Sequence, residues 1–223
     1  MNMNRKKIIE WLLSSDPSIR WQVKHFLLNE TDKAIHAERL RVNSEGWGKK
    51  ILSFQDADGK WSSQLYNGKW ISTTYSLLLL ANFGIFPNSK TQDACHQLFI
   101  GGLYNDEEIR FSSKQKLRDN GVTGLVLGIL SYFQYDDNRI QRIADYLIRS
   151  QNADGSWYFD DREGAEKYSF ETTMIILKGL FEYRNKIPER SKNILEAEKK
   201  GQEFLLKHQL FINEETNLPI NKK

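Results

Sequence analysis

Apolar side chains recur at helical spacing along most of the chain. Ile19, Val23 and Phe26, for example, fall on one face of a helix. Asp16-Pro17 just before them is a typical helix start, because Asp caps free backbone N–H groups and proline at the first helical position loses no hydrogen bond. No run alternates between apolar and polar residues as a strand does. The pattern predicts an all-α fold of helical hairpins, with helices over residues 5–14, 18–28, 33–42, 46–55, 71–83, 90–100, 121–134, 138–150, 169–183 and 190–208.

Two short segments repeat one another. Gln55–Trp61 and Gln151–Trp157 both read Q-x-x-D-G-x-W and begin 96 residues apart. Halfway between them, residues 103–111 stand in the same position but lack the Gln, the Gly and the Trp. The period of about 48 residues is typical of helical repeats. We expect one domain over residues 1–223, with repeats over 46–84, 95–134 (degenerate) and 142–183 and a partial C-terminal repeat over 190–210.

The repeated segment has the chemistry of a structural corner. Asp-Gly favours a tight turn, because glycine accepts positive φ and Asp bonds to nearby backbone. The Gln can bond carbonyls at a helix end or in the next repeat, and the Trp can cover the junction with its N–H satisfied. Ligand contact is the alternative interpretation. A calcium loop fits poorly, because Phe54 and Leu65 would stand where oxygen ligands are needed.

Composition narrows the function classes. The 223 residues carry a net charge of +3 with scattered lysines, so we predict no nucleic-acid partner. Cys95 is the single cysteine, which excludes an intrachain disulfide and favours a reducing compartment. The longest apolar run, residues 77–81, is far shorter than the roughly 20 residues of a membrane span. These features predict a cytoplasmic protein with no integral membrane segment.

The repeated segments resemble the QW motifs of the squalene–hopene and oxidosqualene cyclases, and more broadly the terpenoid-cyclase and protein-prenyltransferase superfamily. The segments Asp16–Trp21, Gly46-Trp47 and Trp70–Tyr75 are also similar to small bacterial squalene cyclase-like proteins. The resemblance implies an α/α toroid, in which inner helices ring a cavity and QW loops tie neighbouring hairpins together. Complete toroids have more helices than this chain. The ring is therefore expected to be open, closed by a homodimer, or short of a C-terminal part.

The catalytic motifs of that superfamily are absent. The cyclases use a protonated Asp in an Asp-x-Asp-Asp motif, which the chain lacks; its acid pairs, Asp136-Asp137 and Asp160-Asp161, are interpreted as solvated turn residues. The prenyltransferases bind zinc through Asp-x-Cys and a distant His, and no Asp-x-Cys occurs. Cys95 and His96 point about 100° apart on a helix, so they do not share a metal easily. We predict neither a metal nor a cofactor.

The starts of the inner helices supply the remaining candidates. Thr73, Thr123 and Thr172 can be placed at equivalent positions, and Ser72 corresponds to Glu171. In a toroid these helix N-termini share one mouth of the cavity, a setting suited to a polar or anionic head group; simple helix capping is the alternative. The candidate substrate-binding residues are Trp70, Ser72, Thr73, Thr74, Tyr75, Thr123, Tyr132, Tyr168 and Thr172.

Two acids are candidates for proton transfer. Glu171 opens a helix expected to face inward, and Asp119, just before Gly121, is the second. Helix-dipole complementarity explains Glu171 equally well. Aromatic side chains such as Trp70, Tyr75 and Phe133 would line the cavity, where π faces stabilise cations.

Two functional hypotheses follow. The first is a squalene or terpene cyclase-like protein that binds an isoprenoid or similar apolar ligand in a central cavity. The second is a non-enzymatic helical scaffold that binds a protein or peptide. Carbohydrate chemistry is a third interpretation, which would need a pair of cavity acids that the sequence does not supply.

Overall fold

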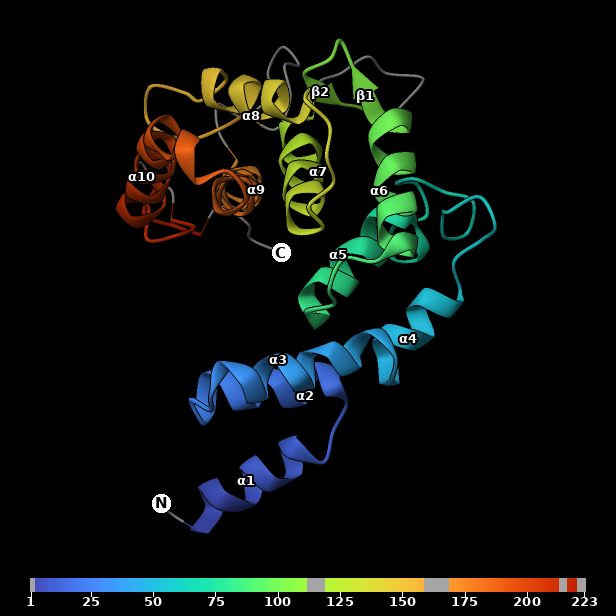
Figure 1. Ribbon diagram of the computed structural model, residues 1–223. Coiled ribbons are helices and arrows are strands. Elements are labelled where there is room, and N and C mark those ends of the chain that lie inside the picture. Colours follow the sequence, from blue (N-terminus) through green and yellow to red (C-terminus); the bar gives the residue numbers. More distant parts are fainter. Residues whose placement is uncertain (1–2, 112–118, 159–168, 213–215, 220–223) are drawn as a thin grey trace. The chain divides into compact units, whose positions relative to one another are not determined.

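The computed structural model describes residues 3–111, 119–158, 169–212 and 216–219 and is mostly helical (Figure 1). The prediction of a mainly helical chain is confirmed. Contacts divide the chain into two compact units, Met1–Gln97 (unit 1) and Leu98–Lys223 (unit 2), and each is described by itself. The single domain over 1–223 stays a prediction. The candidate Tyr168 and the acid pair Asp160-Asp161 lie outside the described residues.

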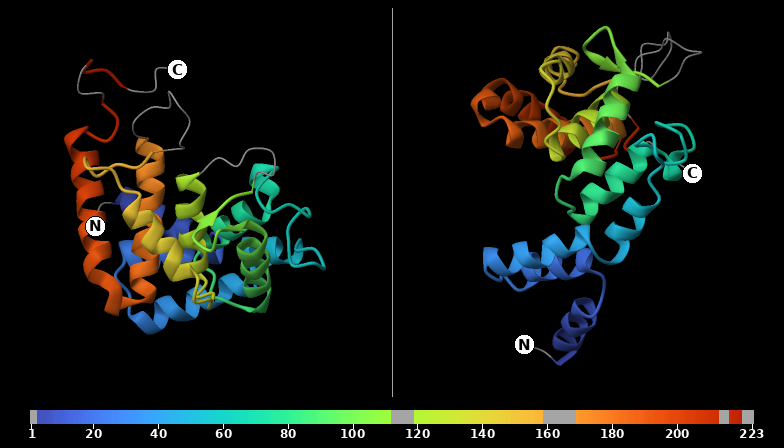
Figure 2. Two further views of the ribbon diagram at one scale, coloured as in Figure 1. Left: turned by 90° about the horizontal axis from the view of Figure 1, so that it is seen from above. Right: turned by 45° about the vertical axis from the view of Figure 1, so that its right-hand side comes forward.

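Unit 1 begins with three short helices and ends in the first half of a longer one. Its elements are α1 (Met3–Leu13), α2 (Pro17–Gln22), the π-helical turn Val23–Leu27, α3 (Asp32–Leu40), the 3-10 turn Arg41–Asn43, α4 (Gly46–Ser53), the 3-10 turn Lys69–Ile71, α5 (Thr73–Phe83) and α6 (Ser89–Gly102), which continues into unit 2. Helices α2 and α3 run side by side (Figure 2). Leu77 and Leu80 of α5 are fully buried in the core of this unit.

One carboxylate organises two helix starts in unit 1. Asp16 Oδ1 accepts a hydrogen bond from Ser18 N (2.9 Å) in the first turn of α2, and Asp16 Oδ2 accepts one from Trp47 N (2.7 Å) in the first turn of α4. Gly46 makes this possible, because a Cβ there would lie 1.9 Å from Asp16 Oδ2, and its φ is +57°. The Asp16-Pro17 start predicted from sequence is confirmed. The Asp16 and Gly46-Trp47 segments, singled out separately in the sequence, therefore meet at one point.

The C-terminal end of α5 is covered by aromatic and cationic side chains from α2 and α3. Trp21 Nε1 donates to Phe83 O (2.8 Å), and the Trp21 ring leaves room only for glycine at position 84, where φ is +81°. Arg39 Nε donates to Gly84 O (2.6 Å), and its guanidinium lies 4.2 Å from the centre of the Phe86 ring. Because the last carbonyls of a helix lack intrahelical donors, these contacts satisfy them.

The described part of unit 2 consists of helices and one pair of short strands. Its elements are the end of α6, β1 (Leu103–Tyr104), β2 (Glu108–Ile109), α7 (Asn120–Tyr132), α8 (Ile140–Arg149), α9 (Phe170–Lys186), the 3-10 turn Pro188–Arg190 and α10 (Ser191–Lys207). Helices α9 and α10 lie side by side (Figure 2). Helix α7 packs closely on α9 (Figure 1).

Glycines allow α7 and α9 to approach one another. A Cβ on Gly179 of α9 would lie 2.2 Å from the carbonyl oxygen of Gly124, and one on Gly124 would lie 2.7 Å from Ile176 Cγ1. Gly128 meets the backbone of Gly179 in the same way, at 3.2 Å from its Cα. Gly124 and Gly128 of α7 therefore lie at the close contact with α9.

The structure also holds two short strands that the sequence pattern did not predict. Leu103 pairs with Ile109, and Tyr104 with Glu108, in an antiparallel register. The expectation of a chain without strands was therefore wrong here. A strand of two residues is too short to show the alternation of apolar and polar residues by which strands are recognised in a sequence. This hairpin stands where the degenerate repeat replaces the QW corner.

Candidate functional site

The first QW corner is a closed hydrogen-bonded junction. Gln55 Nε2 donates to Gly59 O (2.9 Å) within the corner and to Lys90 O (2.8 Å) in helix α6. Trp61 Nε1 donates to Ile51 O (2.9 Å) in the preceding helix α4. The corner therefore ties α4 to α6 and covers the junction with a Trp side chain that is 4% exposed.

The second QW corner repeats these bonds atom for atom. Gln151 Nε2 donates to Gly155 O (2.9 Å) and to Ala197 O (2.9 Å) in α10, and Trp157 Nε1 donates to Leu147 O (2.8 Å) in α8. In both corners the glycine has positive φ, +81° in the first and +92° in the second. The prediction that both segments are structural corners with equivalent Trp roles is confirmed.

The degenerate repeat keeps a buried apolar side chain at the position of the Trp. Ile109 stands 48 residues after Trp61 and 48 before Trp157 and is fully buried, so it supplies apolar cover without an indole. Arg110 and Glu108 form a bidentate ion pair at 2.7–3.1 Å, and both side chains are at most 10% exposed. The predicted period of 48 residues therefore holds at the Trp position.

One threonine near the start of each of the helices α5, α7 and α9 accepts a hydrogen bond from the backbone of a corner. The N–H of Trp61 donates to Thr73 Oγ1 (3.1 Å), and that of Ile109 donates to Thr123 Oγ1 (3.2 Å). In the third repeat the N–H of Trp157 donates to Thr173 Oγ1 (3.2 Å). The structure thus places Thr173, and not the predicted Thr172, in equivalence with Thr73 and Thr123.

The hydroxyl group of each corner threonine also donates a hydrogen bond to a backbone carbonyl. Thr73 Oγ1 donates to Gln64 O (2.7 Å), Thr123 Oγ1 to Asp119 O (2.9 Å) and Thr173 Oγ1 to Ser169 O (2.8 Å). All three side chains are at most 1% exposed. These bonds give the threonines a structural role in the corners, whereas ligand contact by Thr73 and Thr123 stays a prediction.

The neighbouring hydroxyl candidates are buried as well. Thr74 Oγ1 donates to Leu65 O (2.7 Å), and Thr172 is 2% exposed in the first turn of α9. Ser72, the residue before α5, is fully buried and makes no side-chain capping bond. These side chains lie within the protein at the helix starts where the sequence placed them.

The two candidate acids occupy different settings. Asp119 caps α7, since its Oδ1 accepts from Val122 N (2.9 Å), and it is half-buried. Glu171 lies in the first turn of α9 and is exposed. A negative charge in the first turn of a helix is favourable in itself. Proton transfer by either acid stays a prediction.

Two aromatic candidates, Trp70 and Tyr75, lie together with Tyr66 in unit 1. The ring of Trp70 lies edge-on to Tyr75 with centroids 5.2 Å apart, and Tyr75 lies 5.8 Å from Tyr66. Trp70 is 79% exposed and the neighbouring Ile71 60% exposed. We call Tyr66, Trp70, Ile71 and Tyr75 the aromatic platform. In unit 2, the half-buried Tyr132 of α7 contacts the buried Phe133.

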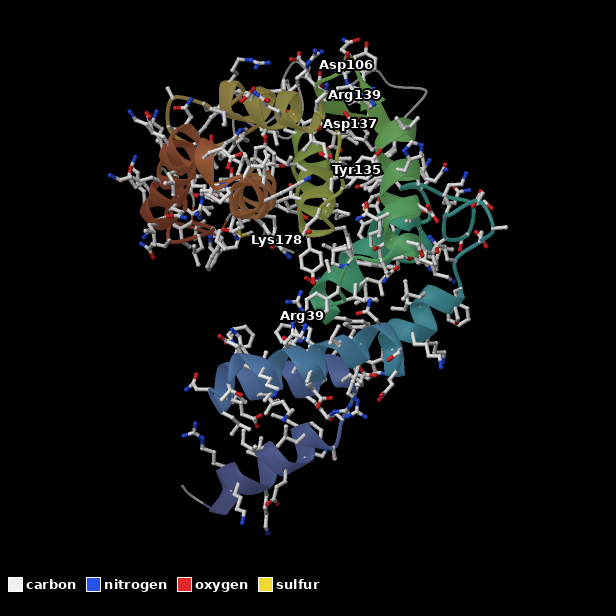
Figure 3. All side chains as sticks on the ribbon, viewed as in Figure 1. Arg39, Asp106, Tyr135, Asp137, Arg139 and Lys178 are labelled. Carbon is white, nitrogen blue, oxygen red and sulfur yellow. The ribbon has the colours of Figure 1, made fainter. Side chains whose placement is uncertain are left out.

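Sequence reasoning missed an ion-pair group at the start of α8. Arg139, the residue before α8, bonds Asp137 through Nε and Nη2 at 2.9 and 2.8 Å, and its Nη1 lies 3.9 Å from Asp106 (Figure 3). Hydrogen bonding to Asp137 raises the pKa of Arg139 above its ordinary value. Asp137 was interpreted as a solvated turn residue; it is an ion-pair partner in the turn before α8. The only indication of this ion pair in the sequence is that Asp137 and Arg139 are two residues apart.

Unit 2 also contains a buried carboxylate on α10. Glu198 is 5% exposed, and its Oε2 accepts from Arg184 Nε (2.9 Å). Burial raises the pKa of Glu198, and the attraction of Arg184 only partly offsets this. Burial also raises the pKa of Glu182 on α9, against the opposing effect of Lys178. When the pKa of a carboxyl is higher in the folded than in the unfolded protein, its protonation stabilises the fold. This stabilisation is complete at pH values below the unfolded-state pKa of 4.5, and it is lost as the pH rises through the folded-state pKa.

Replacing Glu198 should therefore flatten the dependence of stability on pH. The free energy of unfolding of the wild type is expected to fall between pH 4 and pH 8 by more than that of Glu198→Gln, because the amide titrates in neither state. Urea unfolding followed by circular dichroism at both pH values measures the difference. Glu203→Gln is the matched control, since Glu203 is exposed on the same helix. Equal pH dependence in the wild type and Glu198→Gln would contradict the argument.

Four further observations concern metal sites, membrane spans and similar proteins. Within the part of the chain that the structure describes, no three His, Cys, Asp or Glu side chains gather as metal ligands do. Over the same residues, no helix combines the length and apolar character needed to traverse a bilayer. No protein-family model matches the sequence. A search of the curated proteins found no match either.

Proposed function

We propose that the protein is a squalene cyclase-like helical-repeat protein that binds an isoprenoid or similar apolar ligand. The observation that carries the proposal is the aromatic platform of unit 1, where Trp70 and Ile71 are 79% and 60% exposed. Large apolar side chains exposed side by side mark interaction surfaces more often than isolated ones do. A polyisoprene chain offers no hydrogen bonds, so its affinity must come from such apolar area.

The repeated corners support the family resemblance on which the ligand class rests. A corner that ties each outer helix to the next is what the resemblance implies for a QW protein. Both complete corners make the same three side-chain bonds. On this proposal the helical hairpins form part of an α/α toroid, and the cytoplasmic location predicted from sequence remains part of the same proposal.

The proposed role is binding, with catalysis by Glu171 or Asp119 as its extension. Glu171 is exposed in the first turn of α9, and Asp119 Oδ1 accepts the bond that caps α7. If Glu171 transfers a proton to the ligand, Glu171→Gln should abolish turnover and leave the affinity for the ligand unchanged.

A protein or peptide partner is the second candidate. The engagement of the corner threonine hydroxyls favours it, because those groups are then not free to hold a head group. Exposed Trp and Tyr side chains also dominate protein–protein contacts. On this alternative the aromatic platform receives an apolar side chain of the partner.

Ligand binding by the aromatic platform can be tested directly. Farnesyl diphosphate, geranylgeranyl diphosphate and squalene are titrated against the protein, with thermal shift and tryptophan fluorescence as readouts and mass spectrometry for turnover. Trp70→Ala is expected to weaken binding by about tenfold, the effect of losing one large apolar contact. Trp11→Ala is the control, because Trp11 is similarly exposed, at 68%, but lies on α1.

The outcomes separate the two candidates. Equal affinity in Trp70→Ala and Trp11→Ala would contradict the platform as the site, and no shift with the three lipids would contradict the ligand class. A protein that co-purifies with the wild type and is lost only with Trp70→Ala would favour the scaffold.

A further inference from the structure

The two complete corners allow the outer helices beneath them to be compared residue by residue. Gln55 bonds Lys90 O of α6, and Gln151 bonds Ala197 O of α10. The residues three positions further along these helices are Asp93 and Lys200. A Cβ added to Gly59 would have Asp93 as its nearest neighbour, and a Cβ added to Gly155 would have Lys200. Lys90 and Ala197 therefore hold equivalent places.

In the first repeat, the Lys90 side chain binds the end of the preceding helix. Its Nζ donates to Leu52 O (2.8 Å), in the last turn of α4. The counterpart of Leu52 is Ile148 in the last turn of α8, because the Trp indole of each corner bonds the residue just before it. Alanine at position 197 cannot reach the carbonyl of Ile148.

A hollow lies where the lysine side chain is missing. Its volume is about 300 Å³, and it is lined by Ile148, Gln151, Asn152, Ala153, Asn193, Glu196, Ala197 and Lys200. A second hollow of about 220 Å³ shares Ile148 and Asn193 with it. We call the two together the α8–α10 hollow.

The charges around the α8–α10 hollow suit a cation. The last turn of α8 brings the negative end of the helix dipole to it. Lys200 is paired with Glu196 at 3.0 Å. Of the remaining charged side chains that line the hollow, Asp145 and Glu189 are acidic and Lys192 is basic.

We propose that the α8–α10 hollow binds a primary alkylammonium group. The group donates to the carbonyl of Ile148 as the Lys90 ammonium donates to Leu52, and its methylene chain lies over Ala197 and Ile148. A free diamine or the lysine side chain of a partner can supply this chemistry. The inference goes beyond the proposed ligand of unit 1 and does not depend on it.

The central experiment compares the wild type with Ala197→Lys. The substitution supplies the missing ammonium within the chain, so it should raise Tm and remove the site. n-Butylammonium, the chemical equivalent of a lysine side chain, should raise the Tm of the wild type by roughly 3 °C at tenfold excess over its dissociation constant. Tetramethylammonium at the same concentration controls for ionic strength, since it has no N–H to donate. An equal rise in Ala197→Lys, or with tetramethylammonium, would overturn the proposal.

Two further variants keep the test independent of how Ala197→Lys folds. Ala197→Met fills the hollow with an uncharged chain and is also expected to lose the response. Lys90→Ala should lower Tm. The Tm of this variant should also rise more with n-butylammonium than that of the wild type, because the substitution opens an equivalent hollow beside Leu52. An unchanged response in both variants would contradict the site.

Nuclear magnetic resonance then identifies the location and the source. The amides of Ile148 and Asn193 should shift on titration with n-butylammonium, while that of Leu52 should not; the reverse pattern would contradict the assignment. Tighter binding of 1,4-diaminobutane than of an Nα-acetyl-lysine amide would assign the site to a free diamine, and the opposite order would assign it to a partner's lysine. Failure of both compounds to displace n-butylammonium would overturn the proposal.

Discussion

Trp157→Ala is expected to lower the free energy of unfolding of unit 2 by about 3–5 kcal/mol, the range for removing a fully buried large aromatic side chain. Trp157 is 0% exposed, and its indole N–H is bonded to Leu147 O, so the change leaves both a cavity and a carbonyl without its donor. Urea unfolding followed by circular dichroism measures the loss.

Matched variants separate the two contributions of this side chain. Trp157→Phe keeps most of the buried area and loses the hydrogen bond, so about 1–2 kcal/mol is expected. Trp70→Ala, at a 79% exposed position, should change stability by less than about 0.5 kcal/mol. A loss below about 1 kcal/mol for Trp157→Ala would show that the corner is not the junction described above.

Gly179→Ala is expected to destabilise unit 2 by forcing two closely packed helices apart. The new Cβ would lie 2.2 Å from the carbonyl oxygen of Gly124, so α7 and α9 must move apart. Overpacking of this kind costs typically about 1–3 kcal/mol.

Gly121→Ala is the matched control for Gly179→Ala. Its new Cβ would meet no atom closer than 3.4 Å, and alanine favours the helix, so a neutral or stabilising effect of up to about 1 kcal/mol is expected. Equal urea midpoints for the two variants would contradict the close approach of the two helices.

Local chemistry explains what the sequence could predict. The helices α1 to α10 of the described residues followed from apolar spacing and capping residues, as with Asp16-Pro17 at the start of α2. The corners followed from Asp-Gly and the paired Gln and Trp, because each of those side chains bonds within a few residues or to a helix end.

Loop length explains the error at Thr172. The bond from the corner N–H to the threonine spans 12 residues in the first repeat, 14 in the second and 16 in the third. Thr172 and Thr173 are adjacent in the first turn of α9, so only the backbone shows that Thr173 takes the bond. Likewise the shared carboxylate of Asp16 joins residues 31 apart, and no local pattern encodes such a contact.

The way a corner holds its neighbour has a consequence for how the protein could have evolved. The Trp and Thr bonds of each corner stay within its own hairpin, and the Gln reaches the next outer helix through a backbone carbonyl. Every residue type offers that carbonyl, so lysine at position 90 and alanine at position 197 serve equally well. Gene duplication can therefore lengthen the array without a compensating substitution at this bond.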